Sequence, residues 1–253
     1  MLVTGGTGYL GRAVVAQAAA ASWDVVGIGS ADVDIRDRRA VDEVVQRLAP
    51  DVIVHTAYRK DTPAARAVTV DGTAHVANAA VARGARLLHL SSDVVFDGRA
   101  GRPYREHDQQ SPVSDYGRAK SAAEHLVRTL APSALIVRTS LIYGGPGGAS
   151  SVHEDIAHDA TATFYEDEVR CPVQVGDLAR ALLELADSDV SGILHVAGPE
   201  AVSRQQFAEL ITGRRVRHAP APPGRPLDCR LDTSHAVATL ATVLRGVSEV
   251  YGR

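Results

Sequence analysis

Short runs of apolar residues alternate with longer segments of helical character through the first half of the chain. The apolar runs show little alternation with polar residues, which is typical of strands buried on both faces of a parallel sheet. We expect strands at residues 1–3, 24–29, 51–55, 86–90 and 135–138. We expect helices at residues 12–20, 38–48, 63–83 and 114–130. This alternation predicts an α/β protein with a doubly wound, Rossmann-type parallel sheet.

The pattern is looser after Tyr143. The glycine cluster at 144–148 predicts a turn, and the segment from there to Arg170 has weak periodicity and many charges. Regular structure resumes with a helix at 175–186, a strand at 192–197, a helix at 203–212 and, after a Pro-rich loop at 220–226, a last helical segment. We expect residues 1–145 to form the main domain, and residues 146–253 to form a small lobe with segments that return to the main sheet.

Composition narrows the class of protein. The chain has 253 residues, of which 45% are hydrophobic, and a net charge of -3, so no basic field suggests nucleic acid or an anionic membrane as a partner. No apolar stretch approaches the roughly 20 residues that span a bilayer. Because a strand is expected to begin at residue 2, we expect no signal peptide. Cys171 and Cys229, without CxxC spacing, fit a reducing cytoplasm.

Residues 4–11, with the sequence Thr-Gly-Gly-Thr-Gly-Tyr-Leu-Gly, follow the first strand and open the first helix. This is the context in which a glycine fingerprint indicates a dinucleotide site. Gly5 permits the sharp turn, Gly8 lets the backbone approach a pyrophosphate, and Gly11 lets the helix pack closely. Free amides at the helix start would then bind the phosphates. The alternative is a glycine turn with a structural role only.

Tyr116 and Lys120 are four residues apart and therefore lie on one face of the predicted helix. A nearby lysine cation favours the phenolate, so we expect Lys120 to lower the pKa of Tyr116 and to make it an efficient proton-transfer group. Ser92 follows a buried strand, where the carboxyl ends of a parallel sheet gather reactive groups, and its hydroxyl would favour a developing alkoxide. These three residues indicate a carbonyl reductase. The alternative is an ordinary surface pair on an amphipathic helix.

Ten histidines invite a search for a metal site. His153-Glu154 with His158 comes nearest, but its spacing is one residue longer than HExxH. Because residues five apart do not share a helix face, we expect no metal site.

Together these motifs resemble the extended short-chain dehydrogenases/reductases, and among them the dTDP-4-dehydrorhamnose reductase (NAD-dependent epimerase/dehydratase-like) family. The matching stretches lie at residues 4–11, 90–98, 116–124, 138–144, 172–179 and 225–233. The resemblance implies an NAD(P)-binding Rossmann domain at 1–145 and a substrate-binding lobe at 146–253. It also implies reduction of a keto group on a nucleotide-activated 4-keto-6-deoxysugar.

The resemblance implies roles for individual residues. The catalytic residues would be Ser92, Tyr116 and Lys120. The cofactor would be bound by Gly5, Thr7, Gly8, Tyr9, Leu10, Gly11, Arg12, Ser30, Asp34, Ile35, Thr56, Ala57, Tyr58, Ser91, Tyr116 and Lys120. The substrate would be bound by Ser92, Asp93, Val94, Leu141 and Arg225. Other interpretations are that Asp34 caps a helix, that Thr56 ends a strand, and that Arg225 is a solvated loop residue.

The chain departs from the family pattern in four places. Leu141 stands where an aromatic residue often faces the sugar, and Thr69 stands where an asparagine is common. The segment at 144–170 is shorter than the pattern, and so is the whole chain.

The segment after the second predicted strand indicates whether the cofactor is NADPH or NADH. Ser30 carries no charge that would repel a 2′-phosphate, and Arg12 or Arg36 would supply a positive charge, so we expect NADPH, with NADH as the alternative. In that alternative both arginines are solvated and Asp32 reaches the ribose. The enzyme would act in the cytoplasm as a monomer or homodimer. A sugar-nucleotide epimerase and a non-catalytic NADP-binding regulatory subunit are the alternative functions.

Overall fold

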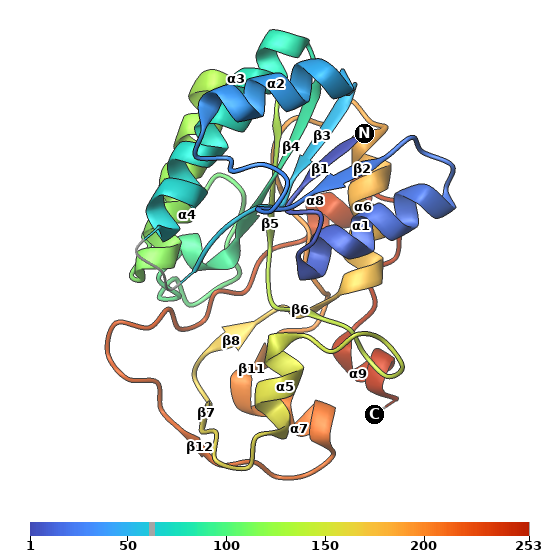
Figure 1. The fold of residues 1–253 in the computed structure, drawn as a ribbon. Coiled ribbons are helices and arrows are strands. Elements are labelled where there is room, and N and C mark those ends of the chain that lie inside the picture. The colour runs from blue at the N-terminus through green and yellow to red at the C-terminus, as the bar shows by residue number, and fades with distance from the viewer. Residues whose placement is uncertain (61–63, 253) are drawn as a thin grey trace.

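The structure, a computed structural model, describes residues 1–60 and 64–252. At its centre lies a six-stranded parallel sheet (Figure 1). In spatial order its strands are β10 (Gly192–His195), β5 (Leu135–Thr139), β4 (Arg86–Ser92), β3 (Val52–His55), β1 (Leu2–Thr4) and β2 (Val26–Ile28). The chain crosses from β2 over β1 to reach β3, so the sheet changes winding direction next to β1. The expected doubly wound parallel sheet is confirmed.

Helices cover both faces of this sheet (Figure 1). One face carries α1 (Tyr9–Ala20), α6 (Val175–Ala186) and α8 (Ser234–Thr239). The other carries α2 (Arg38–Leu48), the π-helical turn η1 (Ala67–Asp71), α3 (Gly72–Arg83) and α4 (Asp115–Leu130). Two apolar clusters fill the two interfaces: Val14, Leu178 and Leu182 belong to the first, and Val45 and Val127 belong to the second. Because both faces are covered, the strands can be almost wholly apolar.

A smaller lobe lies below the carboxyl end of the sheet (Figure 1). Its helices are α5 (Val152–His158), α7 (Arg204–Thr212) and α9 (Val247–Tyr251). Its short strands pair as β6 (Ile142–Tyr143) with β9 (Val173–Gln174), β7 (Phe164–Tyr165) with β12 (His218–Ala219), and β8 (Val169–Arg170) with β11 (Val202–Ser203). Tyr143, Phe207 and Val247 form the centre of its own apolar cluster. The chain passes between the two lobes several times. Strand β10 and helices α6 and α8 thereby return to the main sheet.

Local signals explain where the helices begin and end. Asp37 caps α2 and Ser114 caps α4, each by accepting backbone N–H groups of the first turn. Helix α3 ends at Gly84, whose φ of +71° suits glycine. The expected helix at 63–83 is helical without a break from residue 65 to Arg83, with the π-helical segment η1 inside it, and its expected start at Pro63 lies outside the described residues. The loosely patterned segment at 144–170 contains α5 and two short strands.

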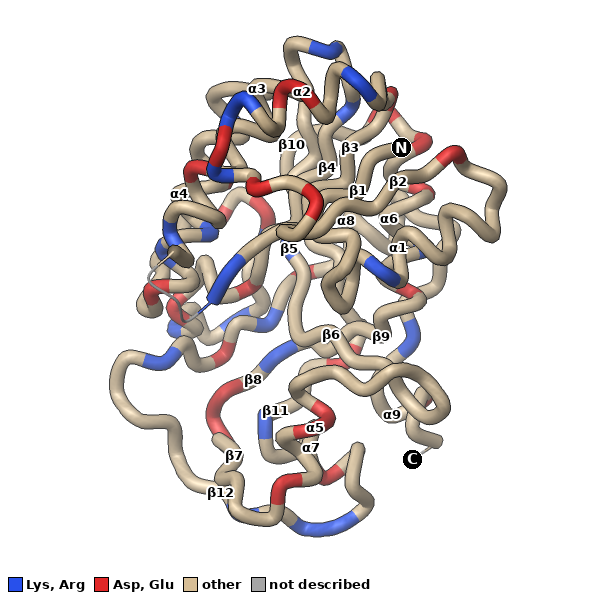
Figure 2. The backbone as a smooth tube through the Cα atoms, in the orientation of Figure 1, with Lys and Arg blue, Asp and Glu red and all other residues tan. Residues whose placement is uncertain are grey.

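Charges of both signs alternate along the chain, with no large region of one sign in the orientation of Figure 2. Over the two described ranges, no helix combines the length and the apolar character needed to cross a bilayer.

Candidate active site

The glycine turn after β1 is closed by a hydrogen bond from the Gly8 amide to the Gly5 carbonyl, at 2.8 Å. Gly5 has a φ of +73°, a conformation that glycine adopts without the strain that a side chain would add. A Cβ on Gly11 would lie 2.1 Å from the Gly5 oxygen, so only glycine lets α1 approach the turn this closely. Helix α1 begins at Tyr9, and its first amides have no partner within the helix. This turn fits a pyrophosphate, because unpaired N–H groups and the helix dipole converge there.

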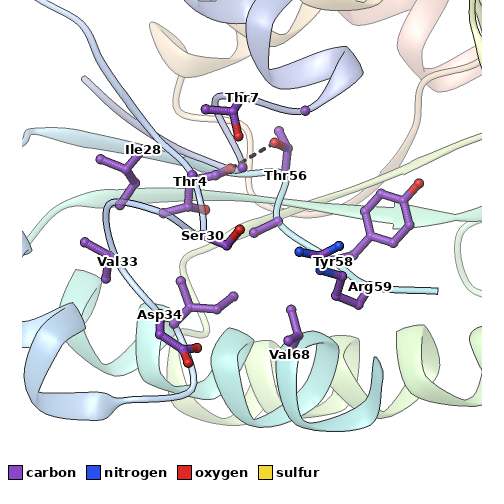
Figure 3. A pocket seen from close by; sticks show the side chains of 15 residues that line it. Thr4, Thr7, Ile28, Ser30, Val33, Asp34, Thr56, Tyr58, Arg59 and Val68 are labelled. Carbon is purple, nitrogen blue, oxygen red and sulfur yellow. Dashed lines mark hydrogen bonds between the residues drawn. The ribbon is translucent and has the colours of Figure 1, made fainter. Parts of the chain in front are cut away.

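Two cavities adjoin the turn. The Ser30 cavity, with a volume of about 260 Å³, lies beyond β2 (Figure 3). It is lined by nine residues that the sequence assigned to the cofactor, namely Gly5, Thr7, Gly8, Ser30, Asp34, Ile35, Thr56, Ala57 and Tyr58. Thr56 also holds the strand ends together, since its hydroxyl donates to the Thr4 carbonyl at 2.8 Å. Arg59, which the sequence did not single out, lines the same cavity.

The acidic residues near Ser30 are occupied by other contacts. Asp32 accepts a hydrogen bond from the Gly29 amide at 2.8 Å. Asp34 does not cap α2; it pairs with Arg36 at 2.6 Å, and this hydrogen bond lowers the pKa of the Asp34 carboxyl to about 2. Arg36 is therefore held by Asp34.

The other predicted cation, Arg12, lies outside both cavities and donates from Nη1 to the Thr7 carbonyl at 2.9 Å. Arg59 is the basic residue among those that line the Ser30 cavity. Its side chain reaches over the cavity toward Ser30 in Figure 3. The positive charge at this end of the site thus comes from the loop after β3.

The Tyr116 cavity, with a volume of about 360 Å³, lies at the carboxyl ends of β4 and β5. It brings together fourteen predicted residues: Gly5, Gly8, Tyr9, Leu10, Gly11, Thr56, Tyr58, Ser91, Ser92, Asp93, Val94, Tyr116, Lys120 and Leu141. Residues Gly5, Gly8, Thr56 and Tyr58 line both cavities, so one elongated ligand can reach from Ser30 to Tyr116 across the glycine turn.

Two neighbouring tyrosines, Tyr58 and Tyr116, each have a lysine ammonium over the ring. The rings of Tyr58 and Tyr116 lie 5.6 Å apart between centroids. Lys60 Nζ lies 5.7 Å from the centre of the Tyr116 ring, and Lys120 Nζ lies 5.3 Å from the centre of the Tyr58 ring. Each ammonium is within the range of a cation–π contact.

The electrostatics of Tyr116 differ from the expectation. Burial, followed by Tyr58 and Asp93, raises the pKa of the Tyr116 phenol, and contact with the Ser92 hydroxyl opposes this. Lys120 is buried, donates from Nζ to the Leu90 carbonyl at 2.7 Å, and has its own pKa lowered by burial to about 8. The prediction that Lys120 lowers the Tyr116 pKa is therefore wrong for this structure, and the phenol is protonated.

Ser92 is positioned by a buried carboxylate. Its Oγ donates to Asp93 Oδ1 at 3.1 Å, while Ser140 Oγ donates to Asp93 Oδ2 at 2.6 Å. Arg170 Nε lies 3.7 Å from the same Oδ2. Burial raises the pKa of Asp93, and Arg170 and the hydroxyls oppose that rise. This network holds the serine hydroxyl at the floor of the cavity.

Comparisons with known proteins agree with this arrangement. The model of the family described as "RmlD substrate binding domain" matches residues 1–249. The chain belongs to this family.

Several known proteins are similar to this chain in sequence. The "dTDP-4-dehydrorhamnose reductase" of Mycobacterium tuberculosis (strain ATCC 25618 / H37Rv) is 36% identical over 219 residues, which cover 81% of this chain and 71% of the relative. The "dTDP-4-keto-6-deoxy-D-glucose reductase" of Streptomyces niveus is 36% identical over 205 residues, which cover 77% of this chain and 71% of the relative.

Solved structures match the whole fold. A crystal structure of a dTDP-4-dehydrorhamnose reductase from Clostridium acetobutylicum ATCC 824 has a TM-score of 0.88 and 28% identity, covering 98% of this chain and 95% of the other. The structure of a dTDP-4-dehydrorhamnose reductase from Bacillus anthracis in complex with NADP also has a TM-score of 0.88. Its identity is 24%, and the match covers 100% of this chain and 96% of the other.

Two departures from the family pattern now have structural explanations. Thr69, in η1, accepts a hydrogen bond from the Arg59 amide and donates to the Arg59 carbonyl, both at 3.2 Å. One hydroxyl thus holds the loop after β3 by both of its hydrogen-bonding functions. Leu141 does line the Tyr116 cavity, where it offers an aliphatic surface.

The short segment after Tyr143 is held by Glu154. This carboxylate accepts hydrogen bonds from the amides of Gly144, Gly145 and Ser151, at 2.8 to 2.9 Å, and from Tyr251 Oη at 2.6 Å. Glu154, which the sequence suggested only as part of a rejected metal motif, therefore ties the cavity wall to the last helix.

Arg225 lies apart from the other predicted substrate residues. It is outside both cavities, pairs with Glu168 and stacks over the ring of Tyr165 at 4.7 Å. The sequence did not single out several cavity residues, namely Lys60, Ser140, Ser151, Val152 and Arg170, or His153 in this role. They come from separate segments, and no spacing in the chain marks them.

Proposed function

We propose that the protein is an NADPH-dependent reductase that acts on the keto group of a nucleotide-activated 4-keto-6-deoxysugar. The observation that carries this proposal is the Tyr116 cavity, in which Ser92, Tyr116 and Lys120 converge beside the glycine turn. A dinucleotide bound at the turn would present its reactive end to these three side chains.

The comparisons support the same activity. Relatives at 36% identity are called dTDP-4-dehydrorhamnose reductase and dTDP-4-keto-6-deoxy-D-glucose reductase. Both names specify an enzyme that reduces the keto group of a thymidine-diphosphate sugar. The structural relative from Bacillus anthracis contains NADP, which agrees with the cofactor expected here.

A bound nicotinamide would supply the hydride, and the protein would supply the proton and stabilise the developing negative charge. Tyr116 donates the proton to the substrate oxygen, which its raised pKa permits because the phenol is protonated. Ser92 donates a hydrogen bond to the same oxygen, after turning its hydroxyl away from Asp93. Lys120, anchored on the Leu90 carbonyl, holds a positive charge beside the nicotinamide end of the site.

The preference for NADPH follows from the Ser30 cavity. Ser30 is exposed and uncharged, and Arg59 provides a cation that attracts a 2′-phosphate. Both carboxylates near Ser30 are engaged, Asp32 by a backbone amide and Asp34 by Arg36. They are therefore less available for the paired hydroxyls of an NAD ribose.

The organisation of the protein follows from this activity. We propose that residues 1–145 hold the dinucleotide and that residues 146–253 supply the substrate wall, apart from the segments that return to the sheet. The two buried thiols, Cys171 and Cys229, suit a cytoplasmic enzyme. It would act there as a monomer or homodimer.

The test is an assay of the purified protein with NADPH or NADH and a panel of nucleotide-linked 4-keto-6-deoxysugars. Loss of the reduced-nicotinamide absorbance with one sugar, faster with NADPH, is the expected result. Tight NADPH binding without turnover of any sugar would contradict the proposal and favour the regulatory subunit. Interconversion of two sugars without net oxidation of NADPH would favour the epimerase.

A further inference from the structure

Basic side chains gather at the Tyr116 cavity, most of them from the small lobe. We call Lys60, His153, Arg170 and Arg204 the basic cluster. Lys60, His153 and Arg170 line the cavity directly. Arg204 lies behind His153, with both terminal nitrogens 3.4 Å from His153 Nδ1. In Figure 2, basic positions are visible on β8 and beside β11, at the side of the small lobe that faces the main sheet.

His153 presents a hydrogen-bond donor within this cluster. Because an arginine only donates, Nδ1 must accept from Arg204, and the ring proton therefore resides on Nε2. Burial, followed by the charges of Arg204 and Lys60, lowers the pKa of His153 to about 3, so the ring is neutral. Among the residues that the structure describes, none accepts a hydrogen bond from Nε2. The His153 ring is therefore polarised by Arg204 and offers its Nε2–H as a hydrogen-bond donor to a ligand in the cavity.

The positive charge of Arg204 is not neutralised by a nearby carboxylate of the described residues. Over residues 1–60 and 64–252, no carboxylate lies within ion-pair distance of its guanidinium, whose hydrogen bonds go to His153 alone. The carboxylate that attracts it most, Glu168, is itself paired with Arg225. Burial is the main cause that lowers the pKa of Arg204 to about 10. A partly buried cation without a carboxylate partner is costly, and a site that keeps one is suited to an anionic ligand.

Arg170 adds a fixed charge to the same wall. It is 4% exposed, and its guanidinium donates to the carbonyl oxygens of Val169, Pro226 and Leu227. Those carbonyls carry no net charge, and Arg170 Nε lies 3.7 Å from Oδ2 of the Asp93 carboxylate. The positive charge is therefore held in place close to the floor of the cavity.

The cofactor does not account for these cations. The pyrophosphate of a dinucleotide is expected at the glycine turn, where the first amides of α1 provide the donors. The basic cluster comes instead from α5, β8, α7 and the loop after β3. Figure 1 shows α5, β8 and α7 in the small lobe, across from the turn. The cavity therefore has two places that favour anions, the glycine turn and the basic cluster.

We infer that the basic cluster binds the diphosphate of a nucleoside-diphosphate-linked substrate, with Arg204 and His153 acting as one donor unit. This inference rests on the proposed function and assigns the phosphate-binding residues within the same site. A diphosphate carries at least two negative charges, which match the charges of Lys60, Arg170 and Arg204. Held there, it would place the attached sugar between the small lobe and Tyr116.

The experiment measures binding of thymidine 5′-diphosphate, without any sugar or NADPH, by isothermal titration calorimetry. Arg204→Met removes the charge and keeps much of the side-chain volume. We expect its Kd to rise about tenfold or more, which corresponds to about 1.4 kcal/mol. Arg204→Lys should lose less affinity for thymidine 5′-diphosphate, because the lysine keeps the positive charge. Arg215→Met, at a side chain that is 91% exposed, is the matched control and should bind as the parent does.

Two further measurements make the result decisive. NADPH binding by Arg204→Met should equal that of the parent, which shows that the other half of the site is intact. Lys60→Met removes an exposed cavity residue and should raise the same Kd severalfold even if Arg204→Met does not fold. Unchanged thymidine 5′-diphosphate binding in these variants, or an equal loss in Arg215→Met, would overturn the inference.

The outcome is separable from that of the proposed reductase activity. If the variants lose thymidine 5′-diphosphate binding while no sugar of the panel is reduced, the basic cluster stands and the reductase proposal fails. If a nucleotide sugar is reduced and Arg204→Met leaves its KM unchanged, the reductase stands and the cluster is not its phosphate site.

Discussion

Lys120 donates a hydrogen bond from Nζ to the carbonyl oxygen of Leu90, at 2.7 Å, and so holds its charge against strand β4. The helix brings Lys120 and Tyr116 to one face, but this contact directs the ammonium to the strand. The phenol next to it is consequently governed by burial and by Tyr58 and Asp93, which raise its pKa. A protonated tyrosine suits reduction, in which the substrate oxygen must gain a proton.

Tyr116→Phe should therefore retain NADPH binding and lose turnover by about 10²- to 10⁴-fold, because only the proton donor is removed. Fluorescence titration with NADPH and steady-state assays with the reduced sugar measure the two effects separately. Turnover of the variant at the parent rate would show that another group delivers the proton.

The rate of reduction should fall as the pH rises above about 8. Burial lowers the pKa of Lys120 to about 8, so the ammonium loses its proton there and not near the value of an exposed lysine. Tyr116 stays protonated over this range because its pKa is raised. The measurement is kcat/KM for reduction between pH 6 and pH 10. A profile that stays flat to pH 10 would mean that the charge of Lys120 is not required.

Ser30→Asp should shift the cofactor preference from NADPH toward NADH. A carboxylate in the Ser30 cavity would repel a 2′-phosphate by roughly 1 kcal/mol or more. We expect the ratio of kcat/KM for NADPH to that for NADH to fall by about tenfold. Ser22→Asp adds the same charge at an exposed turn before β2, outside the cavity, and serves as the control. If the NADPH-to-NADH ratio is the same in both variants, Ser30 does not lie at the 2′-phosphate site.

The buried pair Arg138–Glu124 should matter for stability. Arg138 Nη2 lies 2.8 Å from Glu124 Oε2, and both side chains are at most 2% exposed. Arg138→Met leaves an unpaired buried carboxylate, which should cost about 3–5 kcal/mol in the free energy of unfolding measured with urea.

Two comparisons test this explanation. Arg118→Met breaks an exposed pair with Asp115 on the same helix and should cost less than about 1 kcal/mol. Replacing both members of the buried pair, by Arg138→Met with Glu124→Leu, should cost less than the single change, since no charge is left unpaired. A double variant that is less stable than the single one would contradict the argument.

The parts of this protein that depend on short-range spacing follow from the sequence. A glycine turn needs small residues at set positions, and residues four apart share a helix face whatever the rest of the fold does. The turn at Gly5 and Gly11 and the helix that carries Tyr116 were predictable for this reason. So was the sheet, because strands buried on both faces must be almost wholly apolar.

Only the tertiary structure decided which charges meet. Arg36 was expected at the cofactor but pairs with Asp34, and Arg225 was expected at the substrate but pairs with Glu168. Arg170 instead lines the Tyr116 cavity together with His153, and Arg204, from another segment of the small lobe, contacts His153 from behind. Such pairings depend on the packing of distant segments and on the partners that burial leaves to each charge, and spacing along the chain records neither.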